Sequence, residues 1–83
     1  GLNMRMMYLN NIIDRYDVLR LNSIKNIIEL QDLYNEILKA IETIEDKNQP
    51  KDKNFLSILS WFELEILYDI ETAICSYSES DGE

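Results

Sequence analysis

The chain has 83 residues, of which 46% are hydrophobic, and this composition suits one small folded domain. Sixteen acidic and eight basic residues give a net charge of −8, which disfavours binding to nucleic acids or anionic membranes. This charge either attracts a basic protein partner or only keeps a small domain soluble. The chain has no histidine and one cysteine, which excludes imidazole catalysis, histidine-bound metals and an internal disulfide. We therefore expect a protein that is not an enzyme and that uses no cofactor or metal.

Residues that form turns are almost absent from the chain. Its two glycines are Gly1 and Gly82, and it has one proline, so the sequence indicates an all-α fold. The single cysteine and the lack of a signal peptide or membrane-length apolar run favour a cytoplasmic location. Many asparagines and isoleucines are typical of an AT-rich genome, such as that of a virus or a low-GC bacterium.

The first predicted helix spans residues 3–20. Its expected core face comprises Leu2, Met6, Leu9, Ile13 and Tyr16, widened by Tyr8, Ile12 and Leu19. The helix should end near Arg20, where Asn22 or Ser23 can cap the next helix. Because no glycine or proline forces this break, one continuous rod through the first two helices remains an alternative.

The second predicted helix spans residues 24–46 and has the clearest pattern. Its apolar seam comprises Ile27, Leu30, Tyr34, Ile37, Ile41 and Ile44, widened by Leu33 and Leu38. A polar loop with Pro50 follows, and Asp52 or Asn54 can cap the third helix. The pattern therefore predicts a helix packed on one side.

The third predicted helix spans residues 54–77 and is followed by a frayed acidic tail, 78–83. One apolar stripe comprises Phe55, Leu59, Phe62, Ile66, Ile70, Ala73 and Tyr77, with Leu56, Leu67 and Ile74 at its edges. A second stripe, away from the first, comprises Trp61, Leu64, Tyr68 and Cys75. Two apolar stripes indicate either that neighbouring helices cover both faces or that one stripe binds a partner.

These elements predict an all-α fold: a single domain, 1–83, forming a small three-helix bundle. The alternative is a long helical hairpin that dimerises into a four-helix bundle.

Two polar side chains in the third helix, Cys75 and Glu63, are candidates for a reactive group and a buried charge. Cys75 has no histidine to act as its base and lies far from a helix N-terminus, so the sequence argues against a nucleophile. Glu63 lies at the margin of the core stripe, where it either reaches solvent or pairs with an arginine of the first helix. The candidate arginines are Arg5, Arg15 and Arg20.

The expected function is protein binding through the third helix. Tryptophan and tyrosine are enriched in interface hot spots, and from residue 54 to residue 83 the chain has seven acids and no Lys or Arg. We expect the interface to comprise Trp61, Leu64, Glu65, Tyr68 and Asp69. The leading hypothesis is an inhibitor, immunity or antitoxin-like binder of a basic protein. A structural or assembly subunit that homo-oligomerises through its helices is the alternative, and the first helix covering Trp61 and Tyr68 inside the bundle is a third possibility.

Overall fold

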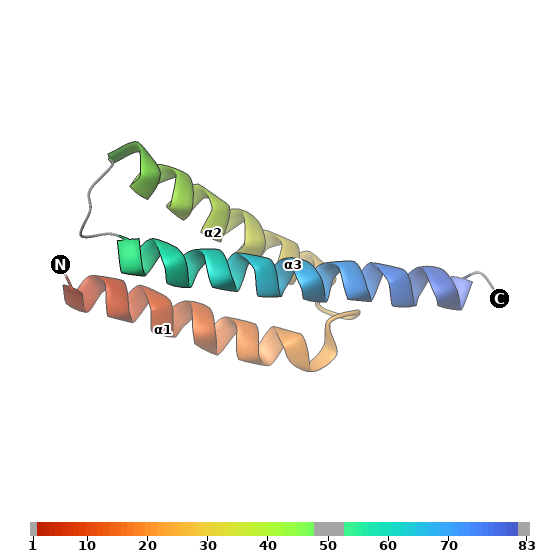
Figure 1. Cartoon of the computed structure of the whole chain (residues 1–83). Helices are drawn as coiled ribbons and strands as arrows, with labels where there is room; N and C mark the ends of the chain where they lie inside the picture. The colour runs from red at the N-terminus through yellow and green to blue at the C-terminus, as the bar shows by residue number, and fades with distance from the viewer. Residues whose placement is uncertain (1, 48–52, 82–83) are drawn as a thin grey trace.

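The chain folds into three α-helices, each of which runs antiparallel to the one before it (Figure 1). The computed structural model describes residues 2–47 and 53–81, and the side chains of residues 4–44 and 53–76. The elements are α1 (Leu2–Leu19), a short 3-10 turn (Arg20–Asn22), α2 (Ile27–Lys47) and α3 (Lys53–Asp81). The predicted all-α three-helix bundle is confirmed, and the single rod is wrong because the chain reverses direction between α1 and α2. Pro50, Asp52 and Gly82 lie outside the described residues.

Asparagines make the reversal between α1 and α2. The Asn22 Oδ1 accepts a hydrogen bond from the backbone N–H of Lys25 at 3.2 Å, but this bond lies in the turn before α2, so the prediction that Asn22 or Ser23 caps the second helix is wrong. The Asn26 side-chain amide donates to the Leu19 carbonyl at 3.2 Å, at the end of α1. The Asn26 carbonyl accepts from the N–H of Leu30 at 2.9 Å, in the first turn of α2. Asn26 thus satisfies backbone groups of both helices, and α2 begins later than predicted.

The core lies between the three helices, and α2 and α3 contribute most of it. The buried hydrophobic residues are Ile12 and Tyr16 of α1, Leu30, Leu33, Ile37 and Ile41 of α2, and Leu59, Phe62, Ile66, Ile70 and Ala73 of α3. The predicted core faces of α2 and α3 agree with this set, although Leu38 is only half-buried, Ile74 is 46% exposed, and the side chain of Tyr77 lies outside those described.

The predicted core face of α1 is partly wrong. Met6 and Ile13 were expected inside, but they are 54% and 37% exposed. The inward face is centred on Ile12 and Tyr16, which were part of the predicted face, and the side chain of Leu2 lies outside those described. Apolar residues occur on every side of α1, so their spacing does not single out one face.

Helix α1 lies further from α3 than α2 does. Aromatic rings separate α1 from α3: Tyr8 contacts Phe55 with ring centroids 6.4 Å apart, and Tyr16 contacts Phe62 at 6.2 Å. The described molecule is elongated, 51 × 22 × 15 Å, because α3 is longer than its neighbours. Helix α3 continues to Asp81, past the predicted end at residue 77 and through most of the predicted frayed tail.

Candidate protein-binding surfaces

A line of large apolar side chains faces outward along α3. Trp61, Leu64 and Tyr68, which we call the α3 stripe, are 56%, 63% and 67% exposed. They lie on the side of the helix opposite the buried Ile66 and Ile70. The third possibility raised by the sequence, that α1 covers Trp61 and Tyr68, is therefore wrong for this chain.

Trp61 is supported at one edge by the core. Its ring meets Phe62 edge-on, with centroids 5.1 Å apart and an interplanar angle of 81°. Phe62 in turn meets Tyr16 of α1 edge-on, at 88°. This ring contact restricts the tryptophan while leaving its outer face open, which suits an aromatic anchor at an interface.

Two acids, Glu65 and Asp69, lie beside the α3 stripe. Both Glu65 and Asp69 are half-buried, on the side of α3 that faces α1. The Tyr16 hydroxyl donates a hydrogen bond to the Asp69 carboxylate, and the Arg20 guanidinium lies 5.3 Å from the centre of the Tyr16 ring. Burial, and then this hydrogen bond, raise the pKa of Tyr16 above its ordinary value. Asp69 therefore belongs to the contact between α1 and α3, and Glu65 is the better candidate for attracting a basic partner.

Glu63 has a partner that the sequence did not suggest. The Tyr34 hydroxyl of α2 donates to the Glu63 Oε1 at 3.4 Å, and burial followed by the Glu63 charge raises the pKa of Tyr34. The arginines named as candidates make other contacts. Arg15 forms an ion pair with Glu36 at 2.7 Å, Arg5 lies 5.4 Å from the Phe55 ring centre, and Arg20 lies against Tyr16.

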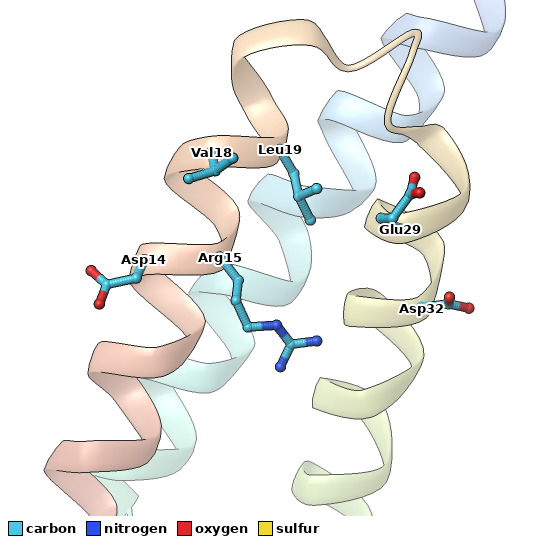
Figure 2. Close-up of a pocket in the computed structure, with 6 residues that line it drawn as sticks. All are labelled: Asp14, Arg15, Val18, Leu19, Glu29 and Asp32. Carbon is cyan, nitrogen blue, oxygen red and sulfur yellow. The ribbon is translucent and has the colours of Figure 1, made fainter.

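A groove between α1 and α2 was not anticipated from the sequence. This α1–α2 groove has a volume of about 460 Å³ and is lined by Asp14, Arg15, Val18, Leu19, Glu29 and Asp32. In Figure 2, Arg15 and Leu19 point from α1 toward α2, whereas Asp14 and Asp32 point outward from the two rims. Only the relative placement of the two helices creates this groove, so periodicity along one helix cannot reveal it.

The same two helices border a second hollow at their other end. This hollow, of about 430 Å³, is lined by residues of all three helices, including Met4 and Tyr8 of α1, Lys39 of α2 and Phe55 of α3. The ion pair between Arg15 and Glu36 joins α1 to α2 between the two hollows.

The described part of the chain contains no group of three or more Cys, Asp or Glu side chains placed to hold a metal ion. Cys75 is a free thiol on the surface of α3. Within the described ranges, no helix combines the length and apolar character needed to cross a membrane. Comparisons with protein-family models, curated proteins and solved structures give no match for this chain.

Proposed function

We propose that this chain is a non-enzymatic protein-binding module that uses the α3 stripe to hold a basic protein. The carrying observation is the exposure of Trp61, Leu64 and Tyr68 on one face of α3, outside the core. Scattered exposed apolar residues are common, but a tryptophan, a leucine and a tyrosine in one line along a helix resemble the apolar centre of an interface.

Charge supports a basic partner for this surface. Acids occur along the whole of α3 without a Lys or Arg after residue 53, and Glu65 lies beside the stripe. Such a surface attracts a positively charged protein and accelerates its association. Inhibition or neutralisation of that protein, as by an immunity protein or antitoxin, is the specific role that this charge favours.

The α3 stripe is tested by the double substitution Trp61→Ala/Tyr68→Ala. Proteins captured from a lysate by the wild-type chain should be released by salt and should bind the variant at least about tenfold more weakly. Far-UV circular dichroism should remain helical because the buried Phe62, Ile66 and Ile70 are unchanged. Unchanged association in a folded variant would contradict the α3 stripe as the interface.

Self-association through the α3 stripe is the second candidate function, since the same apolar line would pair with its copy. Sedimentation at micromolar concentration distinguishes a dimer from a monomer. Glu65→Lys provides a second criterion: it should slow association with a basic partner but hardly change a homodimer. Glu42→Lys, an equal charge change on the exposed face of α2, is the matched control. Asp69 is left intact because its carboxylate accepts the Tyr16 hydrogen bond.

A further inference from the structure

The α1–α2 groove lies on the opposite side of the molecule from the α3 stripe. Figure 2 shows α1 and α2 in front with α3 behind them, whereas the α3 stripe faces away from the core. The groove is therefore a separate surface. Its use goes beyond the proposed role of the α3 stripe and does not depend on it.

Apolar side chains and acids share this groove. Val18 is 63% exposed and Leu19 is half-buried, which leaves an apolar surface between the helices. Asp14 and Asp32 flank that surface on opposite rims, and Glu29 lies at its α2 edge.

The one cation of the groove is already neutralised. The Arg15 guanidinium donates to Glu36 at 2.7 Å and to the Asn11 side-chain oxygen at 3.1 Å. The three acids of the groove, Asp14, Glu29 and Asp32, are therefore not balanced by a basic side chain of its lining, and the groove presents negative charge around an apolar centre.

We propose that the α1–α2 groove docks a cationic amphipathic helix of a partner protein. A helix laid between two antiparallel helices completes a four-helix arrangement and places its apolar face against Val18 and Leu19. Long Lys and Arg side chains on both flanks of such a helix extend outward over the rims, where Asp14 and Asp32 point. An apolar stripe with basic residues on both sides is therefore the chemistry that this groove recognises.

A second copy of the chain does not fit this requirement. A copy carries a net charge of −8, and the helix that bears its α3 stripe belongs to residues 54–83, which contain seven acids and no Lys or Arg. Like charges would meet at both rims of the groove. Charge thus selects a different, basic protein as the occupant.

The test uses a labelled synthetic peptide of about 14 residues, ~21 Å long as a helix, with leucines on one face and lysines on both flanks. Fluorescence anisotropy measures its binding to the full chain. The same peptide with glutamate in place of lysine should not bind. Because Trp61 is the only tryptophan and lies on the opposite face, its emission should not shift when the lysine peptide fills the groove.

The charge-reversing pair Asp14→Lys/Asp32→Lys should raise the peptide Kd by at least about tenfold. The matched control, Asp17→Lys/Glu42→Lys, changes the net charge equally at exposed positions of α1 and α2 that do not line the groove, and should change Kd by less than about threefold. The milder pair Asp14→Asn/Asp32→Asn should give an intermediate loss. Glu29 is not substituted because an acid in the first turn of α2 also stabilises that helix.

The proposal would be overturned if the lysine peptide did not bind up to about 1 mM, if the groove pair and its control weakened binding equally, or if the glutamate peptide bound equally well. A shift in Trp61 emission together with loss of binding in Trp61→Ala/Tyr68→Ala would also overturn it, because the peptide would then lie on the α3 stripe. Failure of the groove leaves the proposed function of the α3 stripe standing, since that function is tested by a different variant on the opposite face.

Discussion

The pairing of α2 with α3 and the attachment of α1 use different kinds of contact. Helices α2 and α3 lie close together around aliphatic residues such as Ile37 and Ile66, both fully buried. Helix α1 adds the fully buried Ile12 and several half-buried apolar residues to the same core, and it is also attached by rings and polar groups, notably Tyr16, which contacts Phe62 and donates to Asp69. Apolar burial stabilises the α2–α3 pair without requiring one particular geometry, whereas the ring contact and the hydrogen bond of Tyr16 depend on how the groups are oriented. Because α1 contributes fewer buried core residues than α2 or α3, we expect it to be the least stable of the three helices.

The largest expected effect comes from breaking the α2–α3 pairing. Ile37→Ala should lower the free energy of unfolding by ~2–5 kcal/mol, because Ile37 is fully buried and its truncation leaves a cavity. Leu38→Ala, at the half-buried neighbouring position, is the control and should cost less than ~1.5 kcal/mol. Urea unfolding followed by far-UV circular dichroism measures both, and equal losses would place Leu38 in the core as the sequence predicted.

A smaller effect is expected from loosening α1 alone. Tyr16→Phe keeps the ring against Phe62 but removes the donor to Asp69, at a cost of ~1–2 kcal/mol. Amide hydrogen exchange should accelerate in α1 while that of α2 and α3 changes little. Uniform acceleration in all three helices would show that α1 does not open separately.

High pH tests the same contact, with a predictable sign. The pKa of Tyr16 is raised from 10.0 in the folded chain, so above pH 10 the unfolded state loses its proton first and stability falls as pH rises. Tyr8 and Tyr34 also have raised pKa values, so the decrease of stability with rising pH should become less steep in Tyr16→Phe without disappearing. Thermal melts between pH 8 and about 11 measure this difference. An unchanged slope would contradict the hydrogen bond to Asp69.

The smallest expected effect is that of the ion pair between α1 and α2. The side chains of Arg15 and Glu36 are 41% and 43% exposed, so solvent screens their attraction. A double-mutant cycle with Arg15→Ala and Glu36→Ala should give a coupling energy below ~1 kcal/mol, lower still at high salt. A coupling above ~2 kcal/mol would mean that polar contacts hold α1 as firmly as burial holds α2.

The fold was largely predictable where apolar residues repeat on one face. Ile37 on α2 and Ile66 on α3 fall in their predicted seams, and both are buried. On α1, the predicted face correctly included Ile12 and Tyr16, which are buried, but it also included Met6 and Ile13, which are exposed. With apolar residues on all sides of α1, only its packing partners determine which face turns inward.

The candidate surfaces were predictable to different degrees. The two stripes on one helix were visible in the sequence, but only the placement of α1 shows that Trp61 and Tyr68 are exposed and not covered inside the bundle. The hydrogen bond between Tyr16 and Asp69 could not be predicted from the sequence, because it joins residues 53 positions apart in the chain. The α1–α2 groove likewise depends on where two helices lie relative to each other, information that no single periodicity contains.

Phe62 connects the exposed Trp61 of α3 to Tyr16 of α1. Its ring contacts Trp61 and also Tyr16, so the same side chain supports the exposed tryptophan and helps to attach α1 to α3. A ligand that immobilises Trp61 would narrow the motion of Phe62 and thereby hold Tyr16 more firmly. By thermodynamic reciprocity, a change that loosens Tyr16 would then weaken that ligand. If Trp61 binds a partner as proposed, the affinity for that partner and the stability of α1 should therefore depend on each other.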